Sequence, residues 1–137
     1  MTIRIAISAL LSVALAAAAQ AQSFEGTYRG TAQLIRELVY LFGGDTCGRG
    51  GGPVAFQVKD SVITTRSQRA GLTFSAPVAG NGTFNITGSY SAGPGERSVT
   101  LEWKGTISGP RLTGTYVGYG AGSDCYFSFV ATKQGRR

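Results

Sequence analysis

Residues 99–107 read Val-Thr-Leu-Glu-Trp-Lys-Gly-Thr-Ile, and this stretch decides the fold class. Its four large apolar side chains recur at odd-numbered positions: Val99, Leu101, Trp103 and Ile107. Because successive side chains of a β-strand point to opposite faces, this period of two predicts a strand with one dry and one wet face. Trp103 is therefore expected in the interior, with Glu102 and Lys104 in water on the opposite face.

The same alternation recurs along most of the chain. Val54, Phe56 and Val58 are predicted to share the apolar face of one strand. Phe84, Ile86 and Tyr90 are predicted to share the apolar face of a second strand. Turn sequences such as Gly80-Asn81-Gly82 separate these runs, and Asn-Gly favours the tight turns of β-hairpins. About eight strands follow, near residues 26–33, 54–59, 61–66, 71–78, 82–90, 98–107, 111–119 and 124–133. Short turns between consecutive strands predict an antiparallel meander.

An eight-stranded meander can close into a small up-and-down barrel, which removes exposed sheet edges, or fold into a β-sandwich. Cys47 follows the first predicted strand and Cys125 begins the last. A bond between them would pin these strands together, and in a barrel the first and last strands are neighbours. We therefore predict an all-β antiparallel barrel, with the sandwich as the alternative.

Those are the only two cysteines in the chain. An even cysteine count in an exported protein predicts a disulfide, here between Cys47 and Cys125. The bridge would close a loop spanning 78 positions. Because the chain contains no histidine, metal binding is the weaker interpretation of these cysteines, and no cofactor is expected.

Residues 34–42 depart from the strand pattern. Leu34, Leu38 and Leu41 recur at helical spacing, and Phe42 extends the apolar run. We favour a short helix that plugs the open end of the core; a strand extension and a hydrophobic lid or partner-docking patch are the alternatives. Leu38, Leu41 and Phe42 are candidate binding residues under the last interpretation.

The N-terminus predicts export. Arg4 is the only charged residue before Glu25, and the apolar stretch between them ends in Ala19-Gln20-Ala21, small residues at the positions a signal peptidase reads. The stretch is too short and too rich in alanine for a membrane-spanning helix. We expect residues 1–21 to be a cleaved signal peptide and residues 22–137 a single β domain. Its location would be periplasmic or secreted, without stable membrane insertion.

Composition argues against catalysis. Without histidine, the Ser-His and Cys-His nucleophile schemes are excluded. Most of the seven acidic residues are expected at turns or strand ends, and only Asp45 and Asp124, each close before a cysteine, could form a pair. We expect no enzyme, with a minor hydrolase using Asp45 and Asp124 as a distant alternative.

Charge and aromatic phase suggest contact surfaces. The net charge of +6 falls to +5 without Arg4, and the basic residues do not cluster, so no nucleic-acid partner is expected. Arg49 lies in a glycine run that could hold an anion. Tyr119 and Tyr126 fall out of phase with the apolar faces of their strands, and exposed tyrosine suits protein or sugar contact.

The stretch Phe24-Glu25-Gly26-Thr27-Tyr28-Arg29-Gly30, with one cysteine in a glycine-rich loop and another in the last strand, resembles a group of small exported proteins of Gram-negative bacteria. The resemblance implies export and a β fold and carries no activity. Gly26-Thr27-Tyr28 is also similar to the opening strand of avidin-like barrels. Their biotin sites contain several tryptophans and this chain has one, so biotin binding is not expected.

The first functional hypothesis is therefore a non-enzymatic exported binding domain with an envelope or extracellular protein or glycan as partner. Small barrels that inhibit proteases or lysozymes are an analogy of fold only. The alternative is a barrel that carries a small apolar ligand. A carrier requires an interior cavity of roughly 300 Å³ or more, whereas a binding domain has a filled core and an exposed patch.

Overall fold

The computed structural model describes residues 24–39, 51–67, 71–91, 98–119 and 123–135. Within these ranges every regular element is a strand. In chain order they are β1 (Gly26–Val39), β2 (Gly51–Lys59), β3 (Val62–Arg66), β4 (Thr73–Pro77), β5 (Thr83–Ser91), β6 (Ser98–Ser108), β7 (Arg111–Tyr119) and β8 (Ser123–Lys133). The prediction of eight strands is confirmed.

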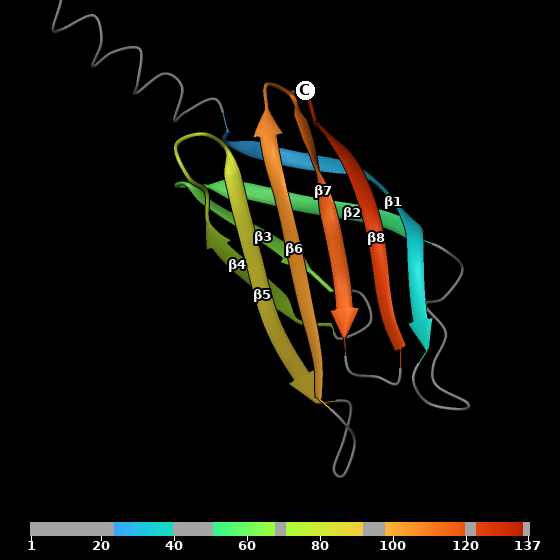
Figure 1. Ribbon diagram of the computed structural model, residues 1–137. Helices are drawn as coiled ribbons and strands as arrows, with labels where there is room; N and C mark the ends of the chain where they lie inside the picture. Colours follow the sequence, from blue (N-terminus) through green and yellow to red (C-terminus); the bar gives the residue numbers. More distant parts are fainter. Residues whose placement is uncertain (1–23, 40–50, 68–70, 92–97, 120–122, 136–137) are drawn as a thin grey trace, which may run out of the picture.

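All eight strands form one antiparallel sheet in the order β4-β3-β2-β1-β8-β7-β6-β5. The first and last strands pair with each other, from Tyr28 opposite Lys133 to Val39 opposite Ser123. β2, β3 and β4 pass behind β5 to β8, which brings the two ends of the sheet together (Figure 1). The predicted meander is confirmed, and the barrel, not the sandwich, is the arrangement found.

The barrel is closed by side chains where β4 meets β5. No backbone ladder joins these two strands in the described part of the chain. The ring of Phe74 on β4 instead lies against the backbone of Gly88 on β5, in the space that a Cβ atom at Gly88 would occupy. The turn between the strands adds a hydrogen bond of 2.9 Å from the Ala79 amide to the Thr83 carbonyl. Side-chain packing therefore takes the place of a backbone hydrogen-bond ladder between β4 and β5.

The two ends of the barrel differ. At one, here called the turn end, residues 60–61, 78–82 and 109–110 connect consecutive strands tightly. Asp60 and Ser61 both have positive φ, 52° and 61°, the conformation that matches the twist of a hairpin. At the opposite end, here called the mouth end, β1, β3, β5 and β7 finish. Their connections to the next strands lie outside the described residues, except that Ser67, Gly71 and Leu72 of the connection after β3 are described.

The core fills the turn end. Phe56 packs against Phe84 and Phe129, with ring centroids 6.1 and 5.1 Å apart. The seven largest fully buried side chains are Tyr28, Phe56, Phe129, Ile63, Ile86, Ile107 and Leu112. The inward positions of β2, β5 and β6 are those that the alternating sequence predicts, and Trp103 is buried with 4% of its surface exposed.

Residues 34–39 correct the interpretation of the leucine-rich segment. They form no helix, because β1 continues to Val39 and pairs with β8 on both sides of Ile35. The ladder shifts register between Leu34 and Arg36, which leaves Ile35 as an extra residue in a β-bulge. Leu34 and Leu38 therefore fall on opposite faces despite their helical spacing. Leu41 and Phe42 lie outside the described residues.

Candidate functional site

Three strands bring an outward-facing aromatic patch together near the mouth end. Across the ladder Arg36 lies opposite Tyr126, which lies opposite Val117 on β7, and Leu38 lies opposite Asp124. Tyr119 ends β7 beside this row. We call the set Arg36, Leu38, Val117, Tyr119 and Tyr126 the tyrosine patch. It joins residues that are more than 80 positions apart in the chain.

The rings of the patch hold one another in place. Tyr119 and Tyr126 meet edge to face, with centroids 6.3 Å apart and planes at 89°. The Arg36 guanidinium carbon lies 5.7 Å from the Tyr126 ring centroid, within the range of a cation–π contact. Val117 in the same row is only 8% exposed. The prediction that both tyrosines leave the apolar face is confirmed, although mutual packing leaves them half-buried.

A pair of oppositely charged side chains on β6 borders the tyrosine patch. Lys104 Nζ lies 3.3 Å from Glu102 Oε1, so the two charges next to Trp103 pair on the outer face as their phase predicts. Burial, followed by the nearby Glu102, Tyr126 and Asp124, raises the pKa of Tyr119, while Lys104 acts in the opposite direction. Tyr119 therefore stays a neutral hydroxyl that can donate a hydrogen bond at physiological pH.

The other candidate residues are only partly placed. Asp124 is buried at the start of β8, but Asp45 lies outside the described residues, so their pairing stays a prediction. Cys125 is buried on the inner face and is not a free thiol, while Cys47 also lies outside. Arg49 does as well. Among the described residues no group of three or more His, Cys, Asp or Glu side chains could hold a metal ion.

A row of aromatic rings crosses the inner face on the mouth-end side of the filled core. Trp103 stacks on Tyr116 at 4.8 Å and 16°, and Tyr116 stacks on Phe127 at 5.4 Å and 24°. Phe74 reaches Trp103 from β4 at 5.5 Å. Phe74, Tyr116 and Phe127 remain partly accessible, unlike the buried rings of Phe56, Phe84 and Phe129. Sequence reasoning missed this row, because only the strand register shows that these residues are neighbours.

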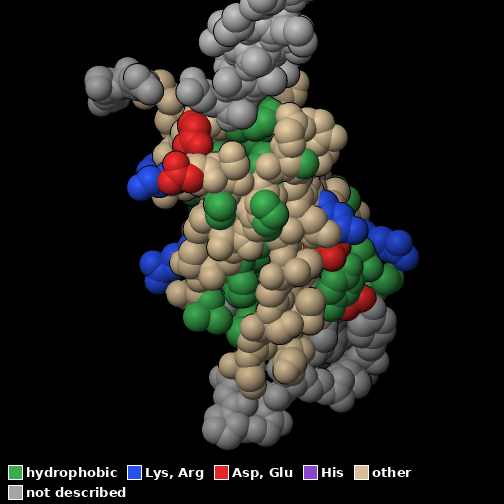
Figure 2. All heavy atoms as spheres, turned by 90° about the vertical axis from the view of Figure 1, so that its left-hand side faces the viewer, with side chains coloured by type: hydrophobic (Ala, Val, Ile, Leu, Met, Phe, Trp, Pro, Cys, Tyr) green, Lys and Arg blue, Asp and Glu red, His purple; other side chains and the backbone are tan. Residues whose placement is uncertain are grey.

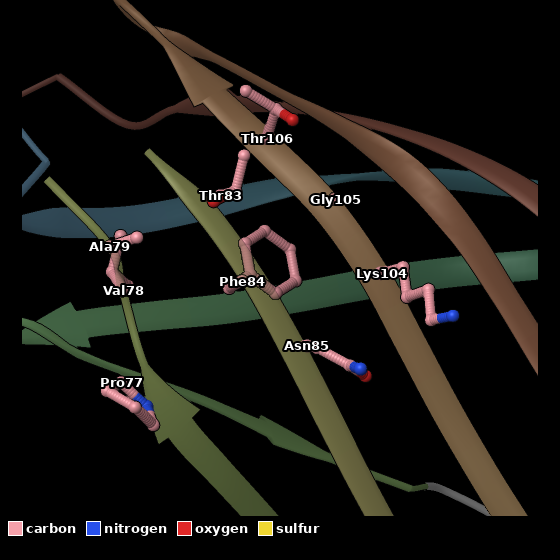
Figure 3. Close-up of a pocket in the computed structure, with 9 residues that line it drawn as sticks. All are labelled: Pro77, Val78, Ala79, Thr83, Phe84, Asn85, Lys104, Gly105 and Thr106. Atoms are coloured by element: carbon pink, nitrogen blue, oxygen red, sulfur yellow. The ribbon is translucent and has the colours of Figure 1, made fainter. Parts of the chain in front are cut away.

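A depression of about 700 Å³ that is open to solvent lies near the turn end, between the β4–β5 turn and the strands β5 and β6. Its lining combines Pro77 at the end of β4 and Val78 and Ala79 of the following turn with Thr83, Phe84 and Asn85 of β5 and Lys104, Gly105 and Thr106 of β6 (Figure 3). The depression is open to solvent, and its side of the barrel shows small, separate hydrophobic groups among polar side chains and backbone (Figure 2). It is therefore not an enclosed ligand cavity.

Comparison of the chain with protein-family models, with curated protein sequences and with solved structures finds no match. In the ranges that the structure describes, no helix is long and apolar enough to cross a membrane. The candidate site is therefore defined by its geometry alone.

Proposed function

We propose that the protein is a non-enzymatic exported binding domain that contacts a protein partner through the tyrosine patch. One observation carries the proposal: Leu38, singled out in the sequence for its apolar spacing, and Tyr119 and Tyr126, singled out for their phase, lie on the same outward face near the ends of three neighbouring strands. Loops and strand ends of a rigid scaffold are common positions for contact residues.

The chemistry of the patch favours a protein. Tyrosine and arginine are enriched at the centres of protein interfaces, which are commonly surrounded by a polar rim. Tyr126 and Arg36 occupy the centre here, and the Glu102–Lys104 pair supplies a rim. Because the two tyrosine rings already support each other, they lose little conformational freedom when a partner covers them.

A carrier of long apolar ligands has less support. The turn end is filled by side chains such as Phe56, Phe129 and Leu112, none of which is more than 2% exposed. A deep cavity would need this volume. The observation that favours the carrier hypothesis is that the rings of Tyr116 and Phe127, on the inner face, remain partly accessible.

Site-specific photo-crosslinking in the native producing cells tests the proposal. A photoreactive amino acid replaces Thr115, an exposed outward residue two positions from Val117, or Thr83 at the turn end of β5 as the matched control. We expect a discrete protein adduct from position 115 that is absent from position 83. The adduct should disappear when Tyr119→Ser and Tyr126→Ser are introduced together and circular dichroism shows an intact fold.

Equal crosslinking from both positions, or no adduct at position 115, would contradict the proposal. So would an adduct that survives the double substitution. An adduct whose added mass is removed by glycosidases alone would replace the protein partner with a glycan.

A further inference from the structure

Two rows of exposed, outward-facing side chains cross four neighbouring strands near the turn end. The pairing of β1 with β8, β8 with β7, and β7 with β6 aligns each row residue by residue. Two of the eight residues are arginines, five carry a hydroxyl group and one is a valine. We call them the arginine–threonine face: Arg29, Thr132, Arg111 and Ser108 in the first row, and Thr31, Val130, Thr113 and Thr106 in the second.

The arginine–threonine face carries positive charge and no carboxylate. Arg29 and Arg111 are more than 80 positions apart in the chain and become neighbours only because both strands pair with β8 at Thr132. In the part of the chain that the structure describes, neither arginine forms an ion pair. The described carboxylates all lie outside the two rows, at Glu25, Glu37, Asp60, Glu102 and Asp124. Both guanidinium groups are therefore available to an acidic partner.

The curvature of the barrel suits this face to a long molecule. Neighbouring strands lie about 4.8 Å apart, so the backbones of Arg29 and Arg111 are separated by about 10 Å. The barrel curves between them, which turns the two side chains away from each other. They therefore match two charges of a longer molecule better than one small anion. The hydroxyl groups around them lie on strands that are paired on both sides, so their positions are fixed before a ligand binds.

We propose that the arginine–threonine face binds a polysaccharide that carries carboxylate groups. Arginine forms two parallel hydrogen bonds with a carboxylate. Threonine and serine hydroxyls both donate and accept hydrogen bonds, and sugar hydroxyls do the same. This surface is separate from the tyrosine patch, which occupies the part of β1, β7 and β8 nearer the mouth end. The proposal therefore does not depend on a protein partner at the tyrosine patch.

Other acidic partners fit the composition of the face less well. The centre of a protein interface is rich in apolar and aromatic side chains, whereas the one large apolar residue among these eight is Val130, which is 41% exposed. Single-stranded nucleic acids are held by stacking on aromatic rings, and membrane surfaces by inserted apolar side chains. The face contains no aromatic residue. Matched charges and hydroxyl groups are what it offers, and a carboxylated sugar chain presents both.

Binding of polygalacturonate, a linear sugar polymer with carboxylate groups, tests the proposal at an ionic strength of about 0.15 M. Arg29→Gln with Arg111→Gln removes both charges of the face. Arg36→Gln with Arg66→Gln removes two other exposed arginines and changes the net charge equally. We expect saturable binding to the wild type and to the control pair, and at least about tenfold weaker binding to the first pair. The unfolding midpoint in urea should be the same in all three proteins.

A second pair of variants separates sugar recognition from simple charge attraction. Thr113→Val with Thr132→Val removes two hydroxyl groups and keeps the charge and the branched shape of both side chains. It should weaken binding of polygalacturonate and leave binding of poly-L-glutamate, which has carboxylates but no sugar hydroxyls, unchanged. Poly-L-glutamate should bind the wild type more weakly than polygalacturonate does.

The proposal is overturned if the wild type does not bind polygalacturonate, or if both arginine pairs lose affinity equally. It is also overturned if the threonine pair binds like the wild type, or if poly-L-glutamate binds as tightly as the sugar polymer. Amide NMR of the wild type supplies a test that does not depend on the folding of a variant. Polygalacturonate should shift the signals of Thr31, Thr113 and Thr132; shifts confined to Tyr119 and Tyr126 would place it on the tyrosine patch and contradict the proposal.

Discussion

The ring of Phe74 on β4 lies directly over the backbone of Gly88 on β5, at the one seam of the described barrel that no ladder closes. The same ring contacts Trp103 at 5.5 Å. A single aromatic side chain therefore links the two edges of the sheet to the core. Gly88 is required by that ring and not by backbone conformation, since its φ is not positive.

Gly88→Ala should weaken this seam. The added methyl group overlaps the Phe74 ring, so the ring must move away from Trp103, and overpacking of this kind costs about 1–3 kcal/mol of unfolding free energy. Urea unfolding measures the loss. The double variant Gly88→Ala with Phe74→Leu should lose less than the sum of the single variants. Additive losses would show that the two residues do not interact.

Trp103→Ala should cost about 3–5 kcal/mol, because it removes a buried indole that contacts rings on two sides. Thr100→Ala on the exposed face of the same strand is the matched control and should change stability by no more than about 0.5 kcal/mol. Chemical denaturation followed by circular dichroism compares the two. A loss below about 1 kcal/mol for Trp103→Ala would mean that the surrounding rings collapse into the space.

Tyr28 should make stability decline in alkali. Burial, with a smaller contribution from Glu25, raises the pKa of its phenol above the ordinary value of 10.0. The folded state thus favours the neutral form, and this stabilisation is complete below pH 10 and is lost as pH rises through the raised pKa. Tyr28→Phe should make the decline shallower between pH 9 and about pH 11. It should also cost about 1 kcal/mol at pH 7, because the 2.8 Å hydrogen bond from the hydroxyl to the Phe24 carbonyl disappears.

Measuring the unfolding free energies of the wild type and of Tyr28→Phe across the alkaline pH range tests this prediction. Parallel curves for the wild type and Tyr28→Phe would assign the alkaline loss to other groups, such as the lysines.

The predicted bridge between Cys47 and Cys125 is tested by thiol chemistry. In denaturant without reductant, neither cysteine should react with a thiol reagent, and both should react after reduction. Replacing both cysteines with serine should lower the unfolding free energy by about 4 kcal/mol, as expected for a loop of this length in the chain-entropy model. A thiol that reacts before reduction would show that the disulfide is not formed and therefore does not stabilise the fold.

The sequence was sufficient to predict the strands, their inner faces and the barrel, because residues such as Phe56, Ile86 and Trp103 alternate with polar neighbours and short turns separate the runs. The phase of Tyr119 and Tyr126 was readable for the same reason. The position of Arg36 over Tyr126 was not, because it depends on how two strands far apart in the chain align. The closure by Phe74 was not readable either, because β4 and β5 follow each other in the chain without forming a ladder, so strand alternation does not show that Phe74 lies over Gly88.

The bulge at Ile35 has a consequence for insertions and deletions in β1. Leu34 opposes Phe127 and Arg36 opposes Tyr126, so the ladder passes over Ile35, which is 61% exposed. Deleting Ile35 would leave each of these cross-strand partners in place and give an uninterrupted strand. Deleting Thr31 instead would move the preceding residues of β1, Tyr28 included, to the opposite face relative to β8. The tolerance of this strand to a change in length is therefore concentrated at a single residue.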